Sequence, residues 1–177
     1  MSLPYRFLGL LALALPPLSC TDPVPGAAVA RLGGEADGVS PGPLHRRGQP
    51  CLVCHSARGP ASNKPFAIAG TVFENAADDA KPAARVKIVL RDSENAPGGA
   101  ETNEVGNFYI RESEWPDPAF PLKVGIERDG KRAEMSSTIN REGSCSFCHK
   151  PVTKSRYALE SDEPRTSIGP VIFEGAQ

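Results

Sequence analysis

Two copies of one short cysteine and histidine motif constrain this chain more than any other feature. They consist of Cys51, Cys54 and His55, and of Cys145, Cys148 and His149. Cys-x-x-Cys-His is the attachment pattern of c-type haem: both thiols form thioethers to the porphyrin vinyl groups, and the histidine is the proximal ligand of the iron. Two intervening residues let both sulfurs reach neighbouring vinyl groups while the histidine turns under the ring. The sequence therefore predicts two covalently bound groups of haem c.

The four motif cysteines leave a second kind of site open. The two pairs flank one predicted domain, and they could meet in space as a tetrahedral four-cysteine zinc site or pair as disulfides. A zinc ribbon of this kind needs no histidine, yet a histidine follows the second cysteine in both pairs. The repeated histidine therefore favours haem over zinc or disulfides.

Candidates for the sixth ligand of each iron are few. Beyond His55, His149 and the initiator methionine, the chain holds one histidine, His45, and one methionine, Met135. Ligation by both would make one haem His/His and the other His/Met, and methionine raises the reduction potential. The alternatives are a solvated loop histidine at His45 and a core-edge side chain at Met135. A haem left five-coordinate would favour a gas sensor or an enzyme.

The amino terminus has the pattern of an export signal. One arginine gives a thin positive region, Phe7 to Leu15 form a short apolar region, and small or neutral residues follow. The apolar stretch is too short to span a bilayer as a helix. Leu18-Ser19-Cys20 resembles the end of a bacterial lipoprotein signal, although Pro17 stands where leucine is usual. This resemblance implies a lipid on Cys20; cleavage after the small residues Ala28 to Ala30 is the alternative.

Region 66–138, between the motifs, shows the alternation of β-strands. Apolar residues alternate in four runs, which are Phe66 to Val72, Val86 to Leu90, Phe108 to Ile110, and Leu122 to Ile126. Turn-forming residues separate them at Asp78 to Pro82, Asn95 to Gly99, Gly106-Asn107 and Asp129-Gly130. Each run can present one apolar face, so the pattern predicts a mainly β domain, a single antiparallel β-sandwich. Asp129-Gly130 predicts a tight two-residue hairpin.

Short motifs follow one another in this region in a distinctive order. They are Gly70-Thr71-Val72, Ala84 to Leu90, Thr102 to Ile110, and Pro121 to Ile126. Order and motifs resemble the carboxypeptidase regulatory-like or transthyretin-like sandwich family, most specifically at the turn Gly106-Asn107-Phe108. The resemblance implies an Ig-like or transthyretin-like fold and no particular activity.

The predicted organisation places a haem-binding sequence at each end of the sandwich. It comprises a signal segment at 1–20, a Pro/Gly-rich tether at 21–50, a first haem-binding segment at 51–65, the β-sandwich at 66–138, and a second haem-binding segment with a tail at 139–177. Trp115, among prolines, predicts a rigid loop whose indole covers one edge of the core. The run Val171 to Phe173 predicts an edge strand or a cover for a haem.

Haem motifs behind an export signal predict an electron-transfer protein and not an enzyme. No acid–base residues cluster by either motif, and a net charge of −1 without a basic stripe argues against a nucleic-acid partner. We expect a cytochrome on the periplasmic side of the cell envelope or at the cell surface, lipid-anchored to the outer membrane through Cys20. Its expected partners are periplasmic or outer-membrane redox proteins. The alternative is a cell-surface β-sandwich binding module stabilised by a four-cysteine zinc site or disulfides.

Overall fold

The computed structural model describes residues 23–35, 37–76, 81–150 and 169–173. The expected signal segment, including Cys20, lies outside these residues. No helix in the described part of the chain is both long and apolar enough to cross a membrane.

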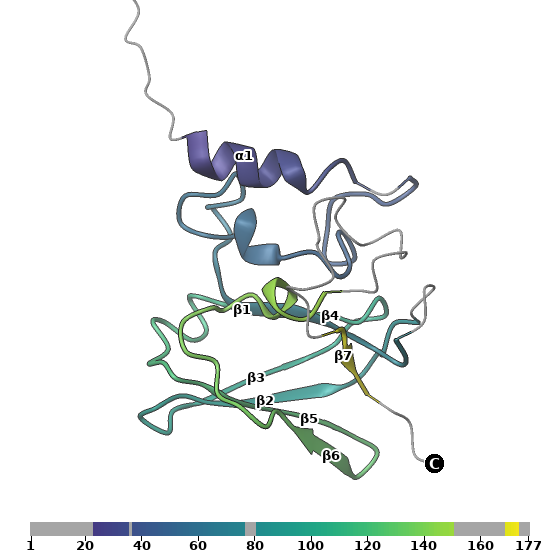
Figure 1. The fold of residues 1–177 in the computed structure, drawn as a ribbon, viewed down its shortest axis with the longest axis vertical. Helices are drawn as coiled ribbons and strands as arrows, with labels where there is room; N and C mark the ends of the chain where they lie inside the picture. The colour runs from purple at the N-terminus through teal and green to yellow at the C-terminus, as the bar shows by residue number, and fades with distance from the viewer. Residues whose placement is uncertain (1–22, 36, 77–80, 151–168, 174–177) are drawn as a thin grey trace, which may run out of the picture.

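Two β-sheets stacked face to face form the body of the protein, below a layer of helix and irregular chain (Figure 1). The strands are β1 (Phe66–Phe73), β2 (Lys87–Arg91), β3 (Pro97–Glu101), β4 (Asn107–Arg111), β5 (Lys123–Arg128), β6 (Lys131–Glu134) and β7 (Val171–Ile172). One sheet has the order β4-β1-β7 and the other β3-β2-β5-β6. All pairs are antiparallel except β1 with β7, which is parallel. The mainly β sandwich predicted from the alternating runs is confirmed.

The hydrophobic core lies between the two sheets. It is built by the inward residues of the predicted runs, namely Ile68, Val72, Val86, Ile88, Leu90, Phe108, Ile110, Leu122 and Ile126. Each of these side chains is at most 8% exposed. Burying one aliphatic or aromatic side chain of this size contributes about 1.5–3 kcal/mol, so the alternation that the sequence shows is also what holds the sheets together.

Two turns adopt the backbone conformations that their residues favour. Asp129 and Gly130 have φ of 52° and 75°, and they join β5 to β6 as the predicted two-residue hairpin. Gly106 has φ of 78°, and a side chain there would collide with the Val72 carbonyl. Only glycine meets both demands at this position.

Strand β3 differs from expectation, because its first three residues, Pro97 to Gly99, were predicted to belong to a turn. Pro97 and two glycines have low strand propensity, but β3 is an edge strand, where proline is tolerated. Gly98 is needed there, since the Trp115 ring occupies the space that a side chain at this position would take. Trp115 is 7% exposed and covers this edge of the core, as predicted.

The segment ahead of the first motif packs against the sandwich. It begins with α1 (Pro23–Arg31), a helix that the Pro and Gly content did not predict; proline is tolerated in a first helical turn because the N–H groups there have no partner in the helix. Further on, Asn107 Nδ2 donates to the His45 carbonyl at 2.9 Å, and Gly48 N–H donates to Thr71 Oγ1 at 2.9 Å. These bonds hold the segment on the outer face of the β4-β1-β7 sheet.

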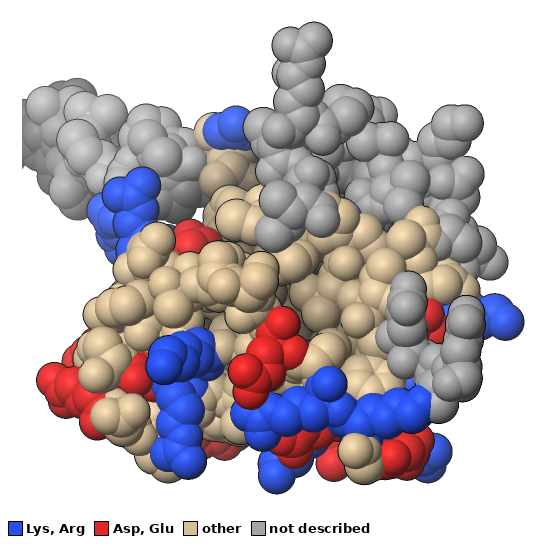
Figure 2. All heavy atoms as spheres, turned by 60° about the horizontal axis from the view of Figure 1, so that its bottom comes forward, with Lys and Arg blue, Asp and Glu red and all other residues tan. Residues whose placement is uncertain are grey.

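The opposite end of the molecule carries charges of both signs. Figure 2 shows Lys and Arg side chains interleaved with Asp and Glu along the lower rim. On the β5–β6 hairpin, Arg132 pairs with Glu127 at 2.6 Å and with Glu134 at 2.7 Å. The hairpin is therefore largely charge-compensated.

Candidate haem-attachment sites

Both motifs fold into the same local structure. Each begins with a short 3-10 turn, η1 (Cys51–Val53) and η2 (Cys145–Phe147). In the first motif the His55 N–H donates to the Cys51 carbonyl at 2.9 Å, and in the second the His149 N–H donates to the Cys145 carbonyl at 2.9 Å. One turn of chain therefore presents two thiols and an imidazole together, twice in the same way.

The two motifs, distant in sequence, are neighbours in space. Both η1 and η2 pack on β1. The Leu52 side chain lies against the backbone of Gly143, and a hollow of about 480 Å³ has Leu52 and Val53 on its wall together with Gly143 and Phe147. The sequence left such a meeting open, because the two motifs flank one predicted domain, but no residue pattern required it.

The first cysteine of each motif is partly buried. Burial raises the pKa of the Cys51 thiol to about 11 and that of the Cys145 thiol to about 12; the nearby Cys51 thiol also contributes to the rise at Cys145. None of the four motif cysteines is in a disulfide. They are therefore free thiols, which is the form that reacts with a porphyrin vinyl group.

One ring nitrogen of His55 is hydrogen-bonded to the backbone, and the other can bind a ligand. Its Nδ1 lies 2.8 Å from the Lys64 carbonyl, and its residue is 9% exposed. A carbonyl only accepts, so Nδ1 is the donor, and in the neutral ring this arrangement leaves the lone pair on Nε2. An N–H donated to a carbonyl is the usual support of a metal-binding histidine, because it fixes the tautomer and the ring orientation.

His149 repeats this arrangement on a different carbonyl. Its Nδ1 lies 3.0 Å from the Gly169 carbonyl, which again leaves Nε2 with a free lone pair. Burial lowers the pKa of His149, and the hydrogen bond opposes this only in part. The imidazole is thus kept neutral, the form that binds a metal.

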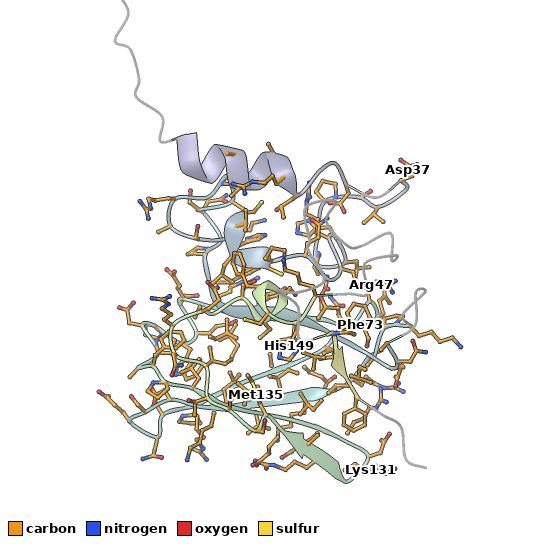
Figure 3. All side chains as sticks on the ribbon, viewed as in Figure 1. Asp37, Arg47, Phe73, Lys131, Met135 and His149 are labelled. Carbon is orange, nitrogen blue, oxygen red and sulfur yellow. The ribbon has the colours of Figure 1, made fainter. Side chains whose placement is uncertain are left out.

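An apolar cavity of about 560 Å³ opens beside the second motif, between the two sheets. Its wall includes Met135, Cys145, Cys148 and His149. Figure 3 shows His149 and Met135 on opposite sides of the space between the sheets. The apolar part of the wall includes Val72, Ile88, Phe108, Val124, Ile126, Ile139, Val171 and Ile172. A cavity of this size and character suits a cofactor.

One polar atom on this wall lacks a partner. Ser144 is 1% exposed, lines the cavity, and its hydroxyl makes no hydrogen bond. A buried hydroxyl without a partner costs free energy, about 1–3 kcal/mol. A polar group brought into the cavity would remove that cost.

His45 lies beside the first motif and not the second. Its ring centroid is 6.0 Å from that of His55, and the two rings are tilted by 44°. Burial lowers the pKa of His45, although the carboxylate of Glu35 opposes this. The structure thus groups His45 with His55, and Met135 with His149.

Sequence reasoning missed the groups that support the two histidines. These are the Lys64 and Gly169 carbonyls, the Ser144 hydroxyl, and the ring of Phe66, which stacks on His55. A backbone carbonyl carries no residue-type signal, so no motif could have identified the first two. The period-two pattern assigned Phe66 to the strand but gave no indication of its contact with His55.

The structure contains no formed zinc site of four cysteines among the residues that it describes. Among the described residues, which include all four motif cysteines, no group of three or more His, Cys, Asp or Glu is arranged to hold a metal ion.

Comparisons with protein-family models, with curated proteins and with solved structures find no match to this chain. The chemistry of the donor set fits covalent haem, with two thiols and one imidazole at each motif.

Proposed function

We propose that this protein is an exported dihaem c-type cytochrome that transfers electrons between redox proteins of the cell envelope. The observation that carries the proposal is the common state of His55 and His149, each with Nδ1 bound to a backbone carbonyl and Nε2 available. Each of these histidines stands next to two free thiols in the same turn. Iron held in this way would supply one-electron chemistry, and the chain supplies attachment, ligation and a partly apolar surrounding.

The distal ligands are proposed from their placement. His45 would complete the first site, because its ring is 6.0 Å from that of His55. Met135 would complete the second, because it shares an apolar cavity with His149. A His/Met pair has a higher reduction potential than a His/His pair, so the two sites would differ in potential despite their identical motifs.

The adjacency of the motifs supports electron exchange within one molecule. Both motifs pack on β1, and their side chains share a hollow. Transfer from the His/His site to the His/Met site would be downhill. We therefore assign the first motif to the side of the electron donor and the second to the side of the acceptor.

A lipid on Cys20 and a location on the periplasmic side of the envelope or at the cell surface belong to the same proposal. They rest on the signal-like amino terminus.

Intact mass spectrometry of the mature protein, combined with its absorption spectrum, tests the whole proposal. The expected mass includes two haems and a diacylglycerol, and the spectrum has a Soret band. A protein that holds about one zinc and no iron would instead establish the binding-module alternative.

A further inference from the structure

Three rings of the first site form a continuous stack. The His55 and Phe66 centroids are 4.0 Å apart with an interplanar angle of 9°, and Phe66 and Tyr109 are 4.5 Å apart at 11°. The guanidinium of Arg111 lies 5.8 Å from the centre of the Tyr109 ring, at the far end. The imidazole of the first motif is therefore anchored to β4 through two aromatic rings.

An irregularity in β1 makes this stack possible. In a regular strand Phe66 and Ile68 would face the same side, and Ile68 belongs to the core. The pairing with β4 shifts between these two residues, so that Phe66 is opposite Arg111 and Ile68 is opposite Ile110. A bulge of this kind re-aims a side chain. It turns Phe66 away from the core and onto Tyr109.

The residues next to the bulge also hold the histidine through the backbone. The Phe66 N–H donates to the His55 carbonyl at 2.9 Å, and the Lys64 carbonyl accepts from His55 Nδ1 at 2.8 Å. One hydrogen bond and one stacked ring thus restrain the imidazole itself, and the second hydrogen bond holds the backbone of the same residue. His149 has the carbonyl bond, but within the described part of the chain no ring stacks on it.

We propose that Phe66 and Tyr109 are positioning residues that fix the ring plane of His55 and thereby lower the reduction potential at the first motif. The inference rests on the proposed function. The stack keeps the Nδ1–H aimed at the Lys64 carbonyl, and a strong hydrogen bond there makes the imidazole a more basic ligand. A more basic ligand favours the oxidised iron, which lowers the potential. Among the residues that the structure describes, no ring restrains the histidine of the second motif, so the stack widens the difference between the two sites.

Four single variants of the full-length mature protein test this inference. Phe66→Leu and Tyr109→Leu remove aromatic faces but keep apolar side chains, whereas Phe66→Tyr and Tyr109→Phe keep the stack and serve as matched controls. Redox titration gives the two midpoint potentials, and electron paramagnetic resonance of the oxidised protein gives the g values of each haem. A Cys145→Ala, Cys148→Ala double variant assigns the signals of the first site.

We expect Phe66→Leu to raise the midpoint potential of the first haem and to shift and broaden its g values. Tyr109→Leu does the same to a smaller extent, because its ring is one step further from His55. The two conservative variants match the parent protein. The second haem, an internal control in every sample, keeps its potential and g values.

Different results would overturn different parts of this reasoning. Two bound haems with unchanged first-site potential and g values in both leucine variants would overturn the inference and leave the proposed function standing. Equal shifts of both haems would also overturn it, since they indicate a general loosening. A parent protein without covalent haem would overturn the proposed function and the inference with it. If Phe66→Leu fails to fold, Tyr109→Leu decides the question, because Tyr109 is partly exposed.

Discussion

At the residue scale, the two sites differ in what surrounds identical motifs. His55 is close to a second histidine and stacks on Phe66. His149 lines a cavity whose wall also includes Met135. In the proposed haem sites, the motif itself would supply the proximal ligand, whereas the reduction potential would depend on the opposite ligand and on the hydrogen bonds around it.

Replacing Met135 tests whether this residue is the distal ligand of the proposed second haem site. Met135→Leu keeps most of the packing, at a cost below about 1.5 kcal/mol in unfolding free energy. We expect the potential of the second haem to fall, because methionine ligation raises it. Redox titration measures this, with the first haem as the unchanged control. An unaltered second potential would show that Met135 only packs against the cavity wall.

The buried thiols predict how the haem-free protein responds to pH. Both Cys51 and Cys145 have a raised pKa in the folded chain, about 11 and about 12 against 9.0 for an ordinary thiol. Between about pH 9 and pH 12 the unfolded chain therefore binds fewer protons than the folded one, so the free energy of unfolding falls as pH rises. Urea unfolding across this range measures it.

The matched control for that titration is the Cys51→Ala, Cys145→Ala double variant. It should lose most of the fall in stability above about pH 9, since the two thiols cause it. The same fall in the double variant would assign the effect to other groups.

At the element scale, two turn glycines have the same kind of backbone conformation in different surroundings. Gly106 and Gly130 both have a positive φ, of 78° and 75°. A side chain at Gly106 would meet the Val72 carbonyl, whereas nothing lies within 4 Å of one at Gly130. A comparison of substitutions at the two positions therefore separates the effect of the left-handed backbone conformation from the effect of steric crowding.

Alanine at these two glycines should give unequal losses of stability. Gly130→Ala is expected to cost about 1–2 kcal/mol of unfolding free energy, for the left-handed conformation alone. Gly106→Ala is expected to cost about 1–3 kcal/mol more, because the added methyl group collides with β1. Chemical denaturation measures both. Equal losses would contradict the close approach of this turn to the strand.

At the scale of the whole molecule, β1 connects the two sites. It pairs with β4 and β7, carries the Phe66 stack, and contacts both η1 and η2. Neighbouring charges interact strongly where water is largely excluded. In the proposed dihaem protein, the oxidation state of one haem should therefore change the reduction potential of the other.

Removing one attachment site tests this coupling. The Cys51→Ala, Cys54→Ala double variant should bind only the second haem and shift the midpoint potential of that haem, because the charge of its neighbour is gone. Redox titration of this variant against the parent protein measures the shift. An unchanged potential would place the two haems too far apart to interact.

Much of the fold could be predicted because its signals are local. The alternation in Ile88 to Leu90 and in Phe108 to Ile110 marks strands, and Asp129-Gly130 marks a hairpin, since each pattern is read within a few residues. Strand β3 was missed because its glycine is explained by Trp115, which lies far along the chain. Helix α1 was missed because its prolines fall in the first turn.

The sequence by itself determined the repeated Cys-x-x-Cys-His motif, the strand pattern and the scarcity of other histidine and methionine residues, since residue type and spacing express all three. Only the tertiary structure decided that η1 and η2 are neighbours, that His45 goes with His55 and Met135 with His149, and that backbone carbonyls hold both histidines. The physical reason is that these relations depend on how strands pair and sheets stack across long separations. Carbonyls are moreover the same in every residue, so their roles appear only when the chain is folded.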